Sequence, residues 1–119
     1  MAEVLIVDDD PFMLDLMQLW LEPLGHAVTL AADGEEATKL AGHAAIDLLI
    51  TDLFMPKKEG TELVLEFRNS HPQAAIIAVS GHAEGSTHLK TARLLGATKI
   101  LTKPLNQQDF LAAIAEVLG

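Results

Sequence analysis

Six polar side chains with the chemistry of acids, nucleophiles or metal ligands stand at the ends of four short apolar runs. Runs of this length that are rich in Val, Ile and Leu are typical of buried β-strands. If the strands are parallel, their carboxyl ends meet along one edge of a sheet, so these side chains converge. They are Asp8, Asp9 and Asp10 after residues 4–7, Asp52 after 46–51, Ser80 after 75–79 and Lys103 after 99–102.

Carboxylates, a hydroxyl and an ammonium group in one crevice suit phosphoryl chemistry. Clustered carboxylates repel one another unless a cation is present, and Mg²⁺ accepts one or two carboxylates together with water and phosphate oxygens. An aspartate can also attack phosphorus and form an acyl phosphate. The ammonium of Lys103 and the hydroxyl of Ser80 can stabilise the charge that spreads over the phosphoryl oxygens.

Amphipathic stretches separate the apolar runs, and their boundaries carry helix signals. Asp10 is a candidate N-cap with Pro11 at the first helical position, and Gly25 is expected to close that helix. Asp33, with Glu36 three residues later, resembles a capping box. The expected strands are residues 4–7, 27–31, 46–51, 75–79 and 99–102, and the expected helices are residues 11–24, 33–41, 61–69, 86–95 and a last helix capped by Asn106.

This alternation predicts an α/β fold of the (βα)5 type. Strands that are apolar on both faces imply a five-stranded parallel sheet with helices on both faces, and right-handed crossovers make it doubly wound. The length of 119 residues favours a single domain over residues 1–119, long enough to bury a core without disulfides or a structural metal.

Composition excludes several classes of function. The formal net charge of -9 argues against direct binding to nucleic acid or to an anionic membrane, because both need a basic surface. The chain has no cysteine, which excludes disulfides and thiolate metal sites. A reducing cytosol fits, so we expect a cytoplasmic location. No stretch looks like a signal peptide or approaches the roughly 20 apolar residues of a membrane span.

In their order along the chain, these motifs resemble those of the response-regulator receiver domains of two-component signalling. The likeness covers essentially the whole chain, and its strength comes from the motifs occurring together at strand ends. The resemblance implies a flavodoxin-like strand order 2-1-3-4-5. The matching motifs are Val7-Asp8-Asp9, Asp47-Leu48-Leu49-Ile50-Thr51-Asp52-Leu53-Phe54-Met55-Pro56 with Gly60, Ser80-Gly81, Gly96-Ala97 and Lys103-Pro104.

The resemblance implies a phosphoacceptor and a metal site. Asp52 would accept the phosphoryl group and contribute to metal binding. Asp8 and Asp9 would be the acidic pair that binds Mg²⁺, directly or through water. The backbone carbonyl of Phe54 would be a further metal ligand. Asp10 is assigned to the helix cap instead of the metal site, because aspartate is a preferred N-cap residue.

The same resemblance implies how the signal is relayed. Ser80 would turn its hydroxyl toward the phosphate, and Lys103 would pair with Asp52 and its phosphate. The bond between Lys103 and Pro104 is a candidate for the cis form. Receivers usually carry Tyr or Phe three residues before this lysine, whereas Ile100 stands here. Relay through an aromatic side chain is therefore in question, although a branched aliphatic residue can still repack.

Two further positions are expected to set how long the phosphoryl group lasts. Phe54 and His82 lie two residues after the acceptor and the hydroxyl residue. In the family, side chains at these positions tune the removal of the phosphate by water. We expect the bulky Phe54 to screen the site, which predicts slow self-hydrolysis.

The predicted function is a phosphorylation-dependent signalling switch. The donor would be a phosphohistidine on a histidine kinase or a histidine phosphotransfer protein, and the recipients would be an unidentified protein target or a second copy of the chain. The domain would catalyse only its own phosphorylation and dephosphorylation, so we do not class it as an enzyme.

Two alternative functions stay open. A degenerate, phosphorylation-independent interaction module is favoured by Ile100 and opposed by the intact acidic site. An aspartyl-phosphate phosphatase is the other, because Asp8-x-Asp10 faintly resembles the nucleophile motif of haloacid-dehalogenase-like phosphatases. That family normally needs a longer chain with a cap.

The first expected helix is too apolar to bury all its large side chains in one core. Leu14, Leu19 or Trp20 is expected to be exposed. Scattered surface apolar residues are ordinary in soluble proteins. The alternative is a contact surface for a kinase helix pair or a second receiver.

Overall fold

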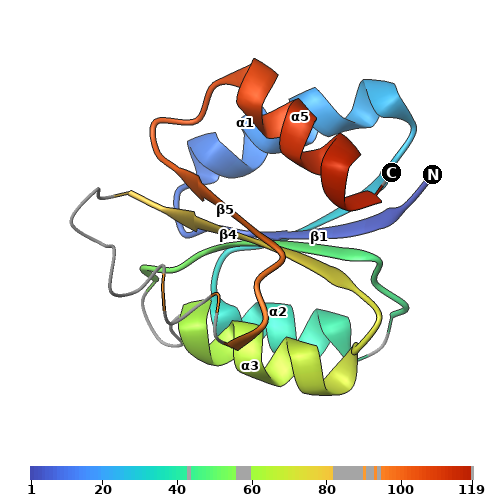
Figure 1. The fold of residues 1–119 in the computed structure, drawn as a ribbon, viewed down its shortest axis with the longest axis vertical. Helices are drawn as coiled ribbons and strands as arrows, with labels where there is room; N and C mark the ends of the chain where they lie inside the picture. Colours follow the sequence, from blue (N-terminus) through green and yellow to red (C-terminus); the bar gives the residue numbers. More distant parts are fainter. Residues whose placement is uncertain (43, 56–59, 82–89, 91–92, 94, 119) are drawn as a thin grey trace.

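The fold is a parallel sheet between two layers of helices (Figure 1). The computed structural model describes residues 1–42, 44–55, 60–81, 90, 93 and 95–118. Five strands pair in the order β2-β1-β3-β4-β5, all parallel, which confirms the predicted α/β architecture and strand order. The strands are β1 (Glu3–Val7), β2 (Ala27–Ala31), β3 (Leu48–Asp52), β4 (Ala75–Ser80) and β5 (Lys99–Thr102).

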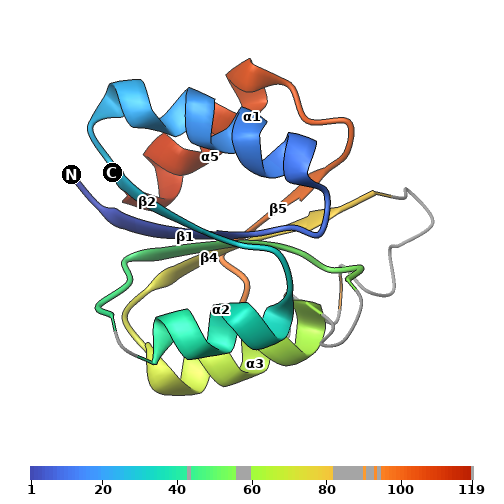
Figure 2. The same ribbon diagram turned by 180° about the vertical axis from the view of Figure 1, so that it is seen from behind.

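Helices cover both faces of the sheet, as predicted. Helices α1 (Pro11–Leu21) and α5 (Gln107–Leu118) lie on one face, and α2 (Gly34–Ala41) and α3 (Gly60–Ser70) lie on the other (Figures 1 and 2). Each face therefore has its own apolar core. None of the helices in the described part of the chain combines the length and the apolar character that crossing a bilayer would need.

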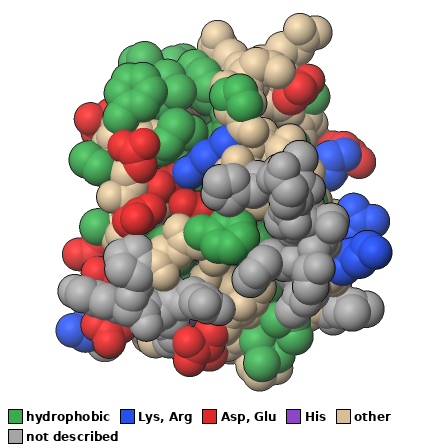
Figure 3. Space-filling view, turned by 90° about the vertical axis from the view of Figure 1, so that its left-hand side faces the viewer, with side chains coloured by type: hydrophobic (Ala, Val, Ile, Leu, Met, Phe, Trp, Pro, Cys, Tyr) green, Lys and Arg blue, Asp and Glu red, His purple; other side chains and the backbone are tan. Residues whose placement is uncertain are grey.

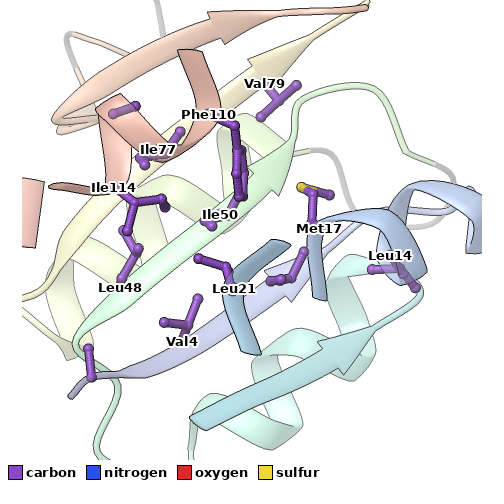
Figure 4. Close-up of a cluster of buried hydrophobic side chains, with 13 residues drawn as sticks. Val4, Leu14, Met17, Leu21, Leu48, Ile50, Ile77, Val79, Phe110 and Ile114 are labelled. Carbon is purple, nitrogen blue, oxygen red and sulfur yellow. The ribbon is translucent and has the colours of Figure 1, made fainter. Parts of the chain in front are cut away.

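The larger core lies between the sheet and the pair α1 and α5 (Figure 4). Met17 and Leu21 project from α1, and Phe110 projects from α5, onto strand residues that include Ile50 and Ile77. All five side chains are 1% exposed or less. Burying a side chain of this size stabilises the fold by roughly 1.5–3 kcal/mol relative to leaving it in water. These contacts fix where α1 begins relative to the end of β1.

Side-chain caps begin the helices where the sequence predicts them. Asp10 Oδ1 accepts a hydrogen bond from the Phe12 N–H at 3.0 Å, and Asp33 Oδ1 accepts one from the Glu36 N–H at 2.9 Å. Glu36 Oε1 reaches back to the Ala32 N–H at 2.7 Å, one residue before the cap. The cap of α1 holds Asp10 at the helix end, which confirms its assignment.

The largest differences from the predicted boundaries are at the end of the first helix and at the start of the third strand. The first helix was expected to reach residue 24, but α1 ends at Leu21 and a 3-10 turn covers Glu22–Leu24. Pro23 explains the change, because its nitrogen has no hydrogen to donate to the helical ladder. Gly25 then takes a left-handed φ of 85°, as its closing role requires. The third strand begins at Leu48 and includes Asp52 itself.

The prediction for the exposed face of α1 is partly confirmed. Leu19 is 65% exposed, whereas Leu14 is 9% exposed and belongs to the core, so its predicted exposure is wrong. Leu14 shares the sheet-facing side of the helix with the other buried residues of α1. Trp20 is half-buried, with its ring centroid 5.3 Å from that of Phe110.

One predicted helix lies mostly outside the described residues. Of residues 86–95, only Lys90, Arg93 and Leu95 are described, each in helical conformation. His82 also lies outside the described residues.

Candidate functional site

The carboxyl ends of β1, β3 and β4 lie next to one another, because these strands are neighbours in the sheet. In the strand register Val7 is opposite Thr51, and Asp52 is opposite Val79. The side chains that end these strands therefore meet at one edge. Asp8, Asp52 and Ser80 are all buried there, with exposures of 1%, 6% and 0%.

The Lys103 side chain contacts the carboxylates at two of the strand ends. Its Nζ lies 3.0 Å from Asp8 Oδ2 and 3.3 Å from Asp52 Oδ2. Its backbone N–H donates to the Ser80 carbonyl at 2.7 Å, which ties the segment after β5 to the end of β4. The Lys103–Pro104 peptide bond is cis, as predicted.

Three carboxylates form a cluster beside this ammonium. Asp8, Asp9 and Asp52 each offer an oxygen within 4.8 Å of the others. Asp9 is exposed, whereas the other two are buried. The Asp10 N–H donates to Asp8 Oδ1 at 2.9 Å, which fixes the orientation of the Asp8 carboxylate. Hard oxygen ligands at this spacing, open to water on one side, fit the preferences of Mg²⁺.

Burial and charge shift two of the ionisable groups. Burial raises the pKa of Asp8 above its ordinary value, and the negative charge of Asp52 adds to this, against the hydrogen bonds from Asp10 and Lys103. For Lys103, burial alone would lower the pKa. The hydrogen bond to Asp8 and the charges of Asp52 and Asp8 outweigh burial and raise it. Lys103 therefore stays charged while the cluster carries an excess of negative charge.

The turn after β3 holds the Asp52 side chain in place. The Phe54 N–H donates to Asp52 Oδ1 at 3.1 Å, and the Thr51 hydroxyl donates to the Asp52 carbonyl at 3.0 Å. The Phe54 side chain is 38% exposed. The use of its carbonyl as a metal ligand stays a prediction.

Gly60 supports this turn in a way that the sequence did not reveal. A Cβ atom built on Gly60 would lie 2.2 Å from the Asp52 carbonyl oxygen and 2.6 Å from Leu53 Cα. The start of α3 therefore passes directly under the acceptor strand, where only glycine fits. The motif contained Gly60, but spacing along the chain gives no sign of this close approach.

The predicted relay position, Ile100, lies in β5. It is half-buried and packs with Leu53, Ala78 and Ala97 in a small separate cluster. That cluster includes residues from β4 and β5 and Leu53, which directly follows β3, so an aliphatic side chain at position 100 contacts the strand ends through packing. Ser80 lies at the end of β4, opposite Thr102.

Comparison with known proteins gives the family. The sequence profile of the response regulator receiver domain matches residues 4–115. The chain is 37% identical to the transcriptional regulatory protein CpxR of Klebsiella pneumoniae subsp. pneumoniae (strain HS11286), covering 99% of this chain and 50% of that protein. It is 34% identical to the regulator of RpoS of Escherichia coli (strain K12), covering 92% of this chain and 32% of that one. The chain thus spans a third to a half of these relatives.

Solved structures agree with this assignment. A CheY-like receiver domain protein from Methanospirillum hungatei JF-1 superposes with a TM-score of 0.92 at 32% identity, covering 99% of this chain and 94% of that one. The chemotaxis response regulator CheY4 of Vibrio cholerae gives a TM-score of 0.91 at 31% identity, with 98% of both chains covered. With its strand order, acidic cluster and sequence profile in agreement, the chain belongs to the response regulator receiver domain family.

Proposed function

We propose that this domain accepts a phosphoryl group on Asp52 and acts as a phosphorylation-dependent switch in two-component signalling. The observation that carries the proposal is the position of Asp52 Oδ2, which lies 3.3 Å from Lys103 Nζ within a cluster of three carboxylates. A buried carboxylate beside a fixed ammonium can attack phosphorus while the ammonium stabilises the charge of the phosphoryl oxygens.

In the proposed step, an Asp52 carboxylate oxygen forms a bond to the phosphorus of a phosphohistidine. The phosphorus–nitrogen bond breaks, and the imidazole of the donor keeps the electron pair and takes up a proton from water. Lys103, already 3.3 Å from Asp52, can contact a phosphoryl oxygen without a large movement. The Ser80 hydroxyl, at the neighbouring strand end, is assigned to a second oxygen.

Asp8, Asp9 and Asp52 are the side chains that would hold Mg²⁺, together with the Phe54 carbonyl. Burial, with a smaller contribution from the charge of Asp52, raises the pKa of Asp8, and a bound cation would offset the cost of keeping this carboxylate ionised. When bound, Mg²⁺ would supply positive charge to the oxygens of the transferring group.

A small phosphodonor tests the proposal without a partner protein. The protein is incubated with acetyl phosphate and Mg²⁺, and its intact mass is measured. We expect one phosphoryl group on the wild-type chain and on Asp15→Asn, a control on the exposed side of α1. Asp52→Asn should take up none. Absence of the adduct in the wild type would favour a phosphorylation-independent module, and sustained turnover of a phosphate ester would favour a phosphatase.

We further assign to Phe54 the control of phosphoryl lifetime. Its N–H donates to Asp52 Oδ1 at 3.1 Å, and its side chain is 38% exposed. Phe54→Asn should shorten the lifetime of the phosphorylated chain several-fold, because a small polar side chain admits and orients water. The decay of the phosphorylated mass over time measures this lifetime. An unchanged lifetime in Phe54→Asn would show that Phe54 does not control it.

The proposed partners are a histidine kinase or a histidine phosphotransfer protein as donor and a protein target downstream. We propose that both partners act in the cytoplasm. A chain without cysteine has no disulfide to lose in that reducing compartment. The CpxR likeness supports a regulatory role of this kind. Phosphoryl uptake is expected only on the domain's own Asp52, with no metabolite converted.

A further inference from the structure

A cavity of about 680 Å³ opens at the end of the sheet where the strands begin. It is lined in part by Ala2, His26 and Asp47, each of which directly precedes a strand. In Figure 1 the start of β1 and the end of α5 lie together on the right. The left side of the molecule, where the strands end, faces the viewer in Figure 3, and acidic side chains gather there beside a basic one. The cavity is therefore separate from the proposed phosphoacceptor site.

The apolar wall of the cavity continues into the larger core. Helix α5 contributes four side chains to this wall: Leu111, Ile114, Val117 and Leu118. Ile114 belongs to the core and the other three pack against it, so the fold holds the wall in place. Sites for small organic molecules have volumes of roughly 300–1,000 Å³ and combine apolar walls with a few polar groups. The cavity has the volume and the lining of such a site.

Asp47 supplies negative charge to the cavity. Its Oδ2 accepts a hydrogen bond from the Glu3 N–H at 2.8 Å, and its own N–H donates to the Glu3 carbonyl at 2.8 Å. These two contacts fix the carboxylate at the start of β3. Within the described part of the chain, no group donates a hydrogen bond to Asp47 Oδ1. This oxygen can therefore accept a hydrogen bond from a ligand.

The described residues that line the cavity offer no positive charge to balance Asp47. The Nδ1 atom of His26 accepts the Ala2 N–H at 3.1 Å, and a ring nitrogen that accepts a hydrogen bond carries no proton. The last turn of α5 contains no basic residue, although the carboxyl end of a helix carries partial negative charge. The cavity therefore favours a cation.

Two basic residues at this end of the sheet have partners of their own. Lys99, which begins β5, lies 2.7 Å from Glu116. Arg68 donates to the carbonyls of Pro72 and Ala74, at 3.0 and 2.7 Å. Neither basic side chain lines the cavity, so neither competes with a cation for Asp47.

We infer that this cavity binds a small organic cation that combines an ammonium group with an apolar tail. The ammonium group donates to Asp47 Oδ1, and the tail packs against the wall that includes Ile114 and Val117. The inference goes beyond the proposed phosphoryl switch and does not rest on it, because neither Asp52 nor a metal takes part in this binding.

Charge selects this occupant over two others. A carboxylate with the same tail would come close to Asp47, with no Lys or Arg in the described lining to bind it. A second copy of the chain carries the same net charge of -9, and like charges oppose association. An ammonium group, in contrast, is attracted by both Asp47 and the end of α5.

Three small molecules with the same alkyl tail test the inference. Hexylamine, hexanol and heptanoate differ in the charge of the head group, and each is titrated into the isotope-labelled chain while amide shifts are followed by NMR. We expect hexylamine to shift the amides of the lining residues with a dissociation constant on the order of 1 mM, as its size allows. Hexanol should bind more weakly, and heptanoate at least about fivefold more weakly than hexylamine.

Two carboxylate variants locate the charge. Asp47→Asn keeps an oxygen for the Glu3 N–H but removes the charge, so it should weaken hexylamine binding about three- to fivefold, the range of an exposed ion pair. Hexanol should bind this variant as it binds the wild type. Asp15→Asn removes an exposed carboxylate from α1 and should leave the binding of both molecules unchanged.

Two tryptophan variants locate the cavity. Ala115 lines it and is exposed, so Ala115→Trp should fill the cavity and weaken hexylamine and hexanol by at least about tenfold. Ala112, also exposed on α5, is not among the lining residues. Ala112→Trp should therefore bind both molecules as the wild type does, and circular dichroism checks that both variants are folded.

Several results would overturn the inference. They are no shift of the lining amides with hexylamine, equal binding of heptanoate, equal loss in Asp47→Asn and Asp15→Asn, or equal loss in the two tryptophan variants. Shifts of the same amides with protein concentration alone, abolished by Ala115→Trp, would show that a second copy occupies the cavity instead. Phosphoryl uptake from acetyl phosphate should be normal in all four variants, so failure of cation binding and failure of the phosphoacceptor proposal are distinguishable.

Discussion

Asp8 is a buried carboxylate in a cluster that carries more negative than positive charge. Burial raises its pKa, so the folded chain holds this proton more tightly than the unfolded chain does. Protonated Asp8 makes its full contribution to the stability of the fold below pH 3.8, the ordinary pKa of this carboxyl. It is lost as the pH rises through the raised pKa of the folded state. At neutral pH the ionised Asp8 therefore destabilises the metal-free fold.

Asp8→Asn should raise the stability of the metal-free chain at neutral pH. The amide oxygen can still accept the Asp10 N–H, and Lys103 keeps Asp52 as a partner. The same variant should bind Mg²⁺ at least about tenfold more weakly, because affinity depends on the number of charged ligands. Urea denaturation with and without Mg²⁺ measures both effects.

Asp10→Asn is the matched control for Asp8→Asn. Asparagine caps helices as well as aspartate does, and Asp10 serves the cap of α1. Its stabilisation by Mg²⁺ should therefore equal that of the wild type. Equal Mg²⁺ stabilisation in Asp8→Asn would contradict the assignment of Asp8 to the metal site.

Lys103 should show a pH dependence of the same sign, at the alkaline end. Its pKa is raised by Asp8 and Asp52 against the effect of burial. Its ion pairs stabilise the fold below the ordinary value of 10.5, and this contribution is lost as the pH rises through the raised pKa. The difference in unfolding free energy between wild type and Lys103→Gln should be constant near neutral pH and shrink in strong alkali.

Lys99→Gln provides the comparison for Lys103→Gln. Lys99 lies 2.7 Å from Glu116, but both side chains are well exposed, at 38% and 63%. Exposed pairs of this kind contribute about 0–1 kcal/mol. Denaturation across the alkaline range should therefore separate the two lysines. A Lys103→Gln difference that does not vary with pH would show that its ion pairs add nothing to stability.

At the scale of elements, the start of α3 is the most constrained contact of the site. A Cβ at Gly60 would lie 2.2 Å from the Asp52 carbonyl oxygen. Gly60→Ala should cost about 1–3 kcal/mol, the usual range for overpacking, and should displace the turn that holds Asp52. Thermal unfolding measures the stability, and uptake from acetyl phosphate measures the site.

Gly42→Ala is the control for the Gly60 prediction. A Cβ there would meet only the carbonyl oxygens of Thr38 and Lys39, at 3.4 and 3.6 Å, which are ordinary contact distances. Its melting temperature should therefore stay within a few degrees of the wild type. If both variants unfolded at the same temperature, the close approach under Asp52 would have no energetic consequence.

The sequence predicts most elements because local signals agree with tertiary packing. β2 and β5 begin and end as predicted, and the caps at Asp10 and Asp33 are confirmed. The end of α1 was missed because Pro23 interrupts the ladder within an apolar stretch that still reads as helical. The burial of Leu14 was missed because an all-round apolar helix does not reveal which side faces the sheet.

The residues of the site also fall into those that the sequence predicts and those that it does not. Asp8, Asp52 and Lys103 could be predicted because parallel strands bring their ends together, and the structure places these three in contact. Gly60 could not, since its constraint arises from how closely α3 passes under β3. Thr51, whose hydroxyl binds the Asp52 carbonyl, was hidden within an apolar run.

At the scale of the whole molecule, the sheet is held between two apolar cores. Residues 1–119 are predicted to unfold as one cooperative domain, because both cores share the same central strands. The fluorescence of Trp20, which lies against Phe110, and far-UV circular dichroism should therefore show coincident transitions in urea. Transitions that separate would contradict a single domain.

Two phenylalanines on the same side of the sheet measure how much the larger core contributes. Phe110 is fully buried, whereas Phe12 is 68% exposed. Phe110→Ala should lower the free energy of unfolding by about 3–5 kcal/mol, and Phe12→Ala by less than about 0.5 kcal/mol. Similar losses in the two variants would show that stability does not follow the burial seen here.

The central claim is that Asp52, and no other carboxylate of the cluster, takes up the phosphoryl group. The most direct measurement treats the chain with acetyl phosphate and Mg²⁺, reduces the acyl phosphate with borohydride, and sequences the peptides by mass spectrometry. Borohydride converts a phosphorylated aspartate to homoserine and so marks its position. We predict homoserine at position 52 alone. Homoserine at position 8, 9 or 10, or an unmodified chain, would contradict the account.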